Sequence, residues 1–189
     1  MKNKLQLQQG FTYLELIVVI SIFAILSVII AYIFLLYNQV QNEAKITQRI
    51  VGNQRFIMEV MVREIRMAEI DYNSYASPVT NPQQVLYLRD PDDNILTFEK
   101  VTSGCPTGVT SCVQVTKGTN TAIISADDVN VNHLTFYINP EYDPNVISAG
   151  SYLADEQHLV TISLEIESVD DPEIIIPIQS SASSKRYKR

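Results

Sequence analysis

The chain has 189 residues, 46% of them hydrophobic, and a formal net charge of −7 at pH 7. That length is enough for one globular domain with a hydrophobic core and an appended segment. From residue 72 to residue 184 fifteen acidic residues stand against three basic ones, and such a surface repels nucleic-acid phosphates and anionic lipid headgroups. The balance therefore argues against a general nucleic-acid-binding role for this part.

The N-terminal segment has the composition of a membrane anchor. Residues 1–10 are polar and carry Lys2 and Lys4 without an acidic residue, whereas Leu16–Leu36 contains no charge, proline or glycine. These 21 residues would span roughly 32 Å as a helix, which matches the hydrocarbon thickness of a bilayer. The stretch is longer than the apolar core of an ordinary secretory signal, and no A-x-A pattern closes it. Positive charge before the span and none just after it orient the N-terminus toward the cytoplasm, so everything after Tyr37 should lie outside.

The same helix should continue beyond the membrane. Between Asn38 and Asp71, seven apolar residues fall at spacings of three, four and seven and share one helical face, while charges of both signs cover the other. Gly52 is the weak position, costing about 1 kcal/mol relative to alanine. We predict one helix from about Phe11 to Ile70, apolar all round in its first half and amphipathic in its second. The shared face comprises Val40, Ala44, Val51, Met58, Met61, Ile65 and Ala68.

The rest of the chain is typical of β-structure. Turn-forming residues and Pro78 end the helix. In His158–Glu167 polar and apolar side chains alternate, which indicates a strand with one buried face. The polar run Arg89–Asn94 between two such segments predicts a hairpin turn. The predicted fold class is α+β, a long N-terminal α-helix packed on an antiparallel β-sheet. The predicted strands are Val85–Arg89, Ile95–Val101, Cys112–Lys117, Ala122–Ser125, His133–Ile138, His158–Glu167 and Ile174–Gln179.

Glu15 is the one charged residue that the predicted membrane helix does not account for. Glu15 lies at the membrane end of the otherwise uncharged span, where an isolated carboxylate costs about 2.5 kcal/mol or more. No basic residue lies near it on the same helix. The fold alone does not explain it, so we expect a partner from another molecule.

The segment Gly10–Leu16, GFTYLEL, followed by an aliphatic run, resembles the prepilin cleavage and methylation motif of type IV pilins and type II secretion pseudopilins. The resemblance implies that a prepilin peptidase cleaves after Gly10, where the absent side chain fits the backbone into that enzyme. It implies that Phe11 becomes the N-methylated terminus. Glu15 matches the glutamate that in this family pairs with the N-terminal amine of a neighbouring subunit, which supplies the missing partner.

These features divide the chain into four parts: a leader (residues 1–10), a transmembrane and filament-core helix (11–37), an amphipathic stem (38–71) and a β-rich head with a basic tail (72–189). The resemblance implies a precursor held in inner-membrane lipid with its head outside. A membrane assembly platform then moves it into an extracellular or periplasmic filament of other pilin or pseudopilin subunits. No G-x-S-x-G, phosphate-binding glycine loop or H-E-x-x-H motif is present. We expect no cofactor, and the chain is a substrate of enzymes rather than an enzyme.

Two softer resemblances concern the kind of subunit. Phe56–Ala68 resembles the stem of larger minor subunits of the W or J type, and Ile178–Arg189 resembles the last strand and basic end of that group. A generic amphipathic helix and tail would show the same pattern. Many major pilins carry a proline in the hydrophobic helix that lets a stretch melt during packing, and Tyr32 stands at that place here. We expect a minor subunit, with pilus, secretion pseudopilus and DNA-uptake system left open.

The two cysteines predict a disulfide. Cys105 and Cys112 lie close together in the part expected outside the cytoplasm, where paired cysteines are the usual state. Closing so short a loop would add roughly 2–3 kcal/mol. A zinc site would need a second pair of cysteine or histidine ligands, and two unpaired thiols are the remaining alternative.

Other polar groups give weaker indications. His133 and His158 have no ligand neighbours in sequence and are interpreted as surface or core residues. The tail Lys185–Arg189 is interpreted as solvated, with capture of DNA as the less favoured alternative. The turn after Arg89 offers oxygen atoms that could bind Ca²⁺, although a solvated turn explains them equally and we predict no metal site. The turn residues concerned are Asp90, Asp92, Asp93 and Asn94.

Two functions from other classes compete with the filament subunit. One is an uncleaved single-pass membrane protein with an extracellular adhesin or receptor head. The other is a surface enzyme tethered by the same anchor, against which the lack of a nucleophile, metal or acid–base cluster speaks. An intact Met1 in the mature chain, or cleavage anywhere other than after Gly10, would favour the first rival.

Overall fold

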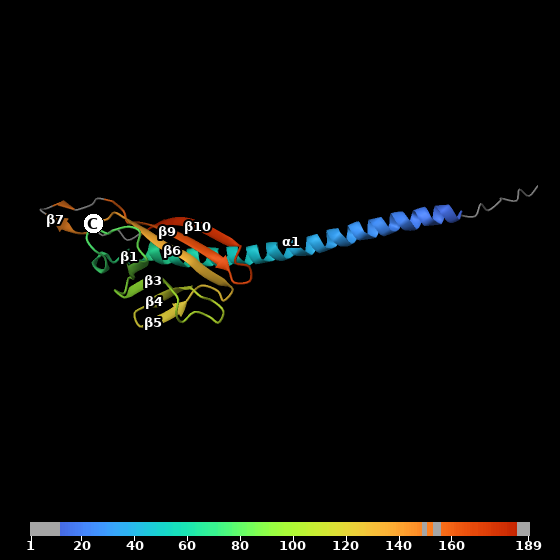
Figure 1. Ribbon diagram of the computed structural model, residues 1–189. Helices are drawn as coiled ribbons and strands as arrows, with labels where there is room; N and C mark the ends of the chain where they lie inside the picture. Colours follow the sequence, from blue (N-terminus) through green and yellow to red (C-terminus); the bar gives the residue numbers. More distant parts are fainter. Residues whose placement is uncertain (1–11, 149–150, 153–155, 185–189) are drawn as a thin grey trace, which may run out of the picture. The chain divides into compact units, whose positions relative to one another are not determined.

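The computed structural model describes residues 12–148, 151–152 and 156–184. The chain divides into two compact units, residues 1–45 and residues 46–189, which are described separately. Helix α1 runs from Tyr13 to Met67 and contributes to both units (Figure 1).

In the first unit the α1 side chains are exposed on every side of the helix. Leu16 is 51% exposed, Phe23 71% and Leu36 49%, although all three are strongly apolar. The hydroxyls of Ser21 and Ser27 donate to the carbonyls of residues 17 and 23, so these polar groups are satisfied within the helix. By length and composition α1 is able to cross a membrane.

The second unit contains the C-terminal part of α1, a short 3₁₀-helix at Tyr72–Ser74 and ten strands within the described residues. The strands are β1 (Glu69–Ile70), β2 (Val85–Arg89), β3 (Ile95–Val101), β4 (Cys112–Lys117), β5 (Asn120–Ile123), β6 (Val129–Asn139), β7 (Ile147–Ser148), β8 (Ser151–Tyr152), β9 (Leu159–Ser168) and β10 (Ile175–Ser183).

The strands form two main antiparallel sheets. One has the order β1-β2-β3-β4-β5 and the other β10-β9-β6, while β7 and β8 form a separate hairpin (Figure 1). In the three-stranded sheet Ile162 of β9 stands opposite Phe136 of β6 and Ser180 of β10. The α+β class is confirmed, and the β-structure that the sequence suggested as one sheet is split into two.

The two sheets share a core with the amphipathic part of α1. Ile57 and Met61 of α1 are fully buried, together with Phe98 of β3, Phe136 of β6 and Ile162 of β9. Each buried aliphatic side chain contributes about 1.5–3 kcal/mol relative to leaving it in water. Four residues of the predicted helical face are buried in this core: Met58, Met61, Ile65 and Ala68. The prediction was wrong for Val40 and Ala44, which are exposed, and it left out the buried Ile50 and Ile57.

The outer edge of β6 is closed by side chains. The Asn81 amide donates to the Ile138 carbonyl and accepts the Ile138 N–H, each at 2.9 Å. The Ser111 hydroxyl donates to the Val131 carbonyl at 2.8 Å, and Gln83 forms a single antiparallel bridge to Phe136. These contacts satisfy backbone groups that a strand edge would otherwise expose.

Several element boundaries differ from the predicted ones. The helix ends at Met67 rather than at Ile70, because Glu69 and Ile70 pair with Arg89 and Leu88 of β2 as strand β1. Strand β5 begins at Asn120 rather than Ala122, since the hairpin after β4 pairs Asn120 with Lys117 across a turn that starts at Gly118. Gly118 has φ +60, a conformation that favours glycine. Strands β6 and β10 are longer than predicted.

The core predicts a contrast between two neighbours in β6. Phe136→Ala should lower the free energy of unfolding by about 3–5 kcal/mol, because it opens a cavity at a fully buried site. Tyr137→Ala removes a side chain that is 45% exposed and should cost about 1 kcal/mol or less. Urea unfolding of the full chain in detergent, followed by near-ultraviolet circular dichroism, measures both. Equal losses would contradict the core assignment.

Candidate functional site

The residues predicted to act in cleavage, methylation and subunit pairing, Gly10, Phe11 and Glu15, lie at or just before the N-terminal end of α1. Gly10 and Phe11 lie outside the described residues, so their roles stay predictions. Thr12 Oγ1 accepts the backbone N–H of Glu15 at 3.3 Å, and the Thr12 carbonyl accepts the N–H of Leu16 at 3.2 Å. Thr12 is therefore the N-cap residue of α1, and Glu15 occupies the third helical position.

This geometry gives Glu15 a favourable local position in addition to its expected pairing with another molecule, which stays a prediction. A Thr-x-x-Glu pattern at a helix start is a capping-box sequence, and a carboxylate in the first turn is favoured by the helix dipole. Sequence reasoning missed Thr12 as a cap, although the spacing itself was the signal. The dipole is worth about 0.3–1 kcal/mol, less than the cost of about 2.5 kcal/mol for a carboxylate in the bilayer. The helix dipole alone therefore does not offset the cost that a bilayer position would impose on Glu15.

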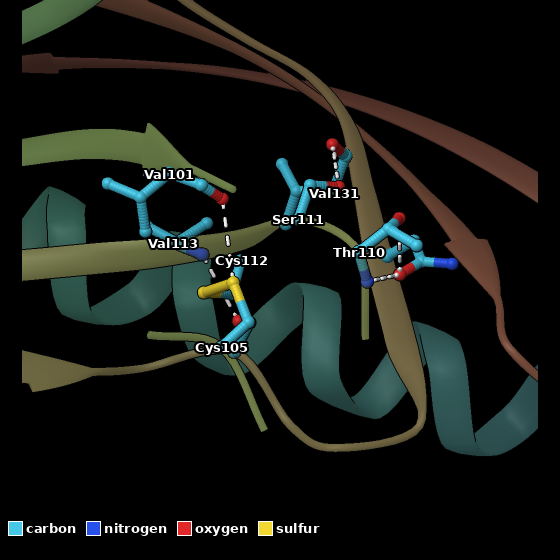
Figure 2. Close-up of a disulfide and its surroundings, with 9 residues drawn as sticks. Val101, Cys105, Thr110, Ser111, Cys112, Val113 and Val131 are labelled. Atoms are coloured by element: carbon cyan, nitrogen blue, oxygen red, sulfur yellow. Dashed lines mark hydrogen bonds between the residues drawn. A yellow bond between two sulfur atoms is a disulfide. The ribbon is translucent and has the colours of Figure 1, made fainter. Parts of the chain in front are cut away.

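Cys105 and Cys112 form a disulfide, as predicted, with 5.7 Å between their Cα atoms (Figure 2). Cys112 is fully buried at the start of β4. Hydrogen bonds attach the closed loop to β6. Thr110 donates its backbone N–H and its hydroxyl to Oδ1 of Asn130 in β6, at 2.8 and 3.1 Å. The disulfide thus ties the loop to β4, and the Thr110 hydrogen bonds tie it to β6 of the other sheet.

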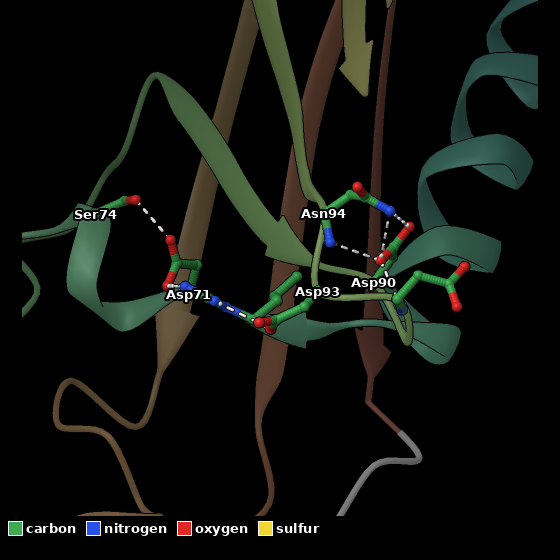
Figure 3. A network of polar contacts seen from close by, with 7 residues as sticks. Asp71, Ser74, Asp90, Asp93 and Asn94 are labelled. Atoms are coloured by element: carbon green, nitrogen blue, oxygen red, sulfur yellow. Dashed lines mark hydrogen bonds and ion pairs between the residues drawn. The ribbon is translucent and has the colours of Figure 1, made fainter. Parts of the chain in front are cut away.

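The acidic turn between β2 and β3 is a hairpin connection, as the sequence predicted. Asp90 accepts the backbone N–H groups of Asp92 and Asn94, both at 2.9 Å, and Figure 3 shows its contacts with Asn94. Asp90 also forms an ion pair with Lys117 at 2.9 Å. The Lys117 ammonium and these N–H donors hold the pKa of Asp90 well below its usual value, although burial opposes the shift. Asp90 therefore acts as a charged anchor of the turn.

A second ion-pair group lies beside this turn. Arg89 contacts Asp71 at 2.9 Å and Asp93 at 3.1 Å, and these contacts raise the pKa of Arg89 (Figure 3). Asp71 also accepts the Ser74 hydroxyl at 2.7 Å. The carboxylates of Asp71, Asp90 and Asp93 already bind arginine, lysine or hydrogen-bond donors of the same chain. These contacts support the interpretation of the turn as a structural element. In the described ranges no group of three or more His, Cys, Asp or Glu side chains is placed to hold a metal ion.

The two histidines have different environments. His133 is exposed in β6, whereas His158 is only 2% exposed and packs against the Tyr72 ring at a centroid distance of 5.5 Å. Among the residues that the structure describes, neither ring nitrogen of His158 has a hydrogen-bond partner. Desolvation lowers the pKa of His158, while the nearby charges of Asp143 and Glu69 oppose the shift. The basic tail, residues 185–189, lies outside the described residues, so DNA capture stays untested.

The fold and the apolar N-terminal helix define a pilin-like class, an α+β protein with two antiparallel sheets on the second half of one long helix. Residues 5–31 match the family model described as the prokaryotic N-terminal methylation motif, the signature of type IV pilins and pseudopilins. No curated protein and no solved structure matches the chain. The chain thus has the signature of a pilin- or pseudopilin-like precursor, which indicates a membrane-anchored structural subunit, processed by prepilin peptidase and assembled with other subunits.

His158 predicts a pH dependence of stability. Its pKa in the folded chain lies below the ordinary value of 6.5, so the unfolded chain binds more protons and the free energy of unfolding falls as pH drops below 6.5. His158→Leu should abolish this fall, whereas His133→Leu should retain it. Urea midpoints of the full chain at pH 7.5 and pH 5.5 measure the difference. An unchanged fall in His158→Leu would contradict the assignment.

Proposed function

We propose that the chain is a structural subunit, a minor pilin or pseudopilin, of a type IV pilus or type II secretion-type filament. The observation that carries this proposal is the single carboxylate of Glu15 in the first turn of a helix whose next 21 residues are uncharged and exposed. The methylation motif at residues 5–31 supports it.

Assembly would proceed from the N-terminal end. Prepilin peptidase removes residues 1–10, and the new amine at Phe11 is methylated. Glu15 then pairs with the N-terminal amine of a neighbouring subunit, which makes a charge in an apolar environment tolerable because the two charges neutralise each other. The pair sets the register between neighbours.

Cohesion would come from the apolar surface of Leu16–Leu36. Each aliphatic side chain that passes from water into contact with other helices contributes about 1.5–3 kcal/mol, and lipid provides comparable cover before assembly. A membrane assembly platform would extract the subunit from the inner membrane. The acidic head would face solvent in an extracellular or periplasmic filament.

The minor-subunit assignment has its own support. The helix contains no proline between Tyr13 and Met67, and Tyr32 is helical at the position where many major pilins have one. Phe56–Ala68 has the pattern of W- or J-type stems. The filament type, whether pilus, secretion pseudopilus or DNA-uptake system, would follow from the partner subunits.

Mass spectrometry of the mature chain tests processing. We expect an N-methylated chain that begins at Phe11, and a Gly10→Val variant that keeps Met1 because the added side chain obstructs the peptidase. Gly52→Ala is the matched control, since a Cβ at Gly52 meets no atom within 4 Å. An intact N-terminus in the unaltered protein would support the uncleaved receptor or adhesin instead.

Substitution of Glu15 separates the ion pair from the helix cap. Glu15→Gln keeps the capping-box pattern but removes the charge. We expect its incorporation into filaments to fall by roughly tenfold or more, as removal of one partner of a desolvated pair does. Glu43→Gln, on the same helix, should assemble normally. Assembly of Glu15→Gln at the unaltered level, measured by immunoblot of sheared filaments, would refute the pairing role.

A further inference from the structure

The head contains a groove at the start of β2. The groove has a volume of about 400 Å³ and is lined by β2 itself and by the segment that leads from the 3₁₀-helix to this strand. Tyr75, Thr80, Gln84 and Tyr87 are among its lining residues. We call it the tyrosine groove.

The tyrosine groove differs in charge from the rest of the head. None of its lining residues, all of which lie in the described part of the chain, is charged. Residues 72–184 together carry fifteen acidic side chains and three basic ones. An ionic ligand would find no counter-charge in the lining, and the negative head would in addition repel an anion. The groove is therefore suited to an uncharged ligand.

The main-chain groups of β2 beside the groove are already bonded. The Tyr75 hydroxyl donates to the Val85 carbonyl at 3.1 Å and accepts the N–H of Tyr87 at 2.7 Å. The Tyr87 carbonyl accepts the N–H of Asp71 at 3.1 Å. A peptide that adds to a sheet as a further strand needs unpaired main-chain groups. Because three of these groups are taken, strand addition is disfavoured here.

The polar groups that remain for a ligand belong to side chains. Gln84 is exposed, and its side-chain amide forms no hydrogen bond within the described residues. The hydroxyls of Thr80 and Tyr87 likewise have no partner in this part of the chain. An amide group and a hydroxyl group can each donate and accept hydrogen bonds. Such a set matches a ligand that presents several hydroxyl groups.

The aromatic rings of the groove limit the kind of ring that can bind. The centroids of Tyr75 and Tyr87 are 5.3 Å apart, and the two ring planes make an angle of 77°. Rings in this arrangement cannot enclose a flat base or a proline ring between parallel faces. One tyrosine ring can still pack against the C–H face of a sugar ring, whose hydroxyls then point outward to polar side chains.

We propose that the tyrosine groove binds a neutral oligosaccharide. The Tyr87 ring packs against one sugar unit, and the side chains of Gln84 and Thr80 form hydrogen bonds with its hydroxyl groups. The volume of the groove falls within the range of small-molecule sites, which is roughly 300–1,000 Å³. This inference gives the head a ligand and goes beyond the structural role of the subunit.

Saturation-transfer difference NMR on the full chain tests binding, in a detergent without a sugar headgroup. The neutral probes are cellobiose, lactose and N,N′-diacetylchitobiose. The comparison probes are the acidic sugar digalacturonate and an uncharged proline-rich peptide. We expect at least one neutral disaccharide to bind with a Kd of about 1 mM or tighter, and both comparison probes to bind at least tenfold more weakly.

Paired variants locate the site. Gln84→Ala should weaken binding about fivefold or more, because the hydrogen bonds of its amide to the sugar are lost. Gln179→Ala is the matched control, since Gln179 is exposed in β10 and does not line the groove. Tyr87→Leu should abolish measurable binding, whereas Tyr137→Leu, at an exposed site outside the groove, should retain it. Circular dichroism checks that each variant is folded, and Gln84→Ala decides the matter if Tyr87→Leu is not.

The outcomes separate this inference from the proposed function. The inference is overturned if no neutral disaccharide binds, if a comparison probe binds as tightly, or if Gln84→Ala binds as well as Gln179→Ala. Each of these results leaves the filament function standing, because Gln84→Ala should still be processed after Gly10 and enter filaments. An unaltered chain that is never processed would overturn the proposed function and would leave the sugar-binding result unchanged.

Discussion

The apolar surface of α1 is larger than the head can cover, and the rest of the molecule is organised around that constraint. Ile57 and Met61 are completely buried by the two sheets, whereas Phe23 is 71% exposed. At about 1.5–3 kcal/mol for each aliphatic side chain, an uncovered stretch as long as Leu16–Leu36 is unfavourable in water. In the proposed function, lipid covers this surface before assembly and other helices cover it afterwards. Membrane anchoring and assembly into a filament would then be two solutions to one physical problem.

Two free energies decide whether the position of Glu15 is explained within its own helix or by a second molecule. The Thr12 cap and the helix dipole make the first turn favourable for a carboxylate, by about 1 kcal/mol or less. Placement in the bilayer costs about 2.5 kcal/mol or more. Because the cost of the bilayer position exceeds the gain from the cap and dipole, we propose that Glu15 takes a counter-ion from another molecule. The N-terminal amine of a processed neighbour would carry the required positive charge at the N-terminal end of the helix.

The negative field of the head follows from how its few cations are used. Arg89 binds Asp71 and Asp93, Lys117 binds Asp90, and Lys100 donates to the Asn132 carbonyl at 2.8 Å. These contacts hold turns and strands within the head, and Arg49 of α1 pairs with two further carboxylates, Asp128 and Asp170.

The sequence by itself determined the features that depend on local pattern. The uncharged span, the Gly10–Glu15 motif, the helical spacing of apolar residues and the bounds of β2, β3 and β4 were readable because periodicity, charge and turn residues act over short distances. Only the tertiary structure decided the division into two sheets, the short strand β1 and the desolvation of His158. These depend on pairing between residues far apart in the chain, such as Glu69 with Arg89, for which one sequence carries no local signal.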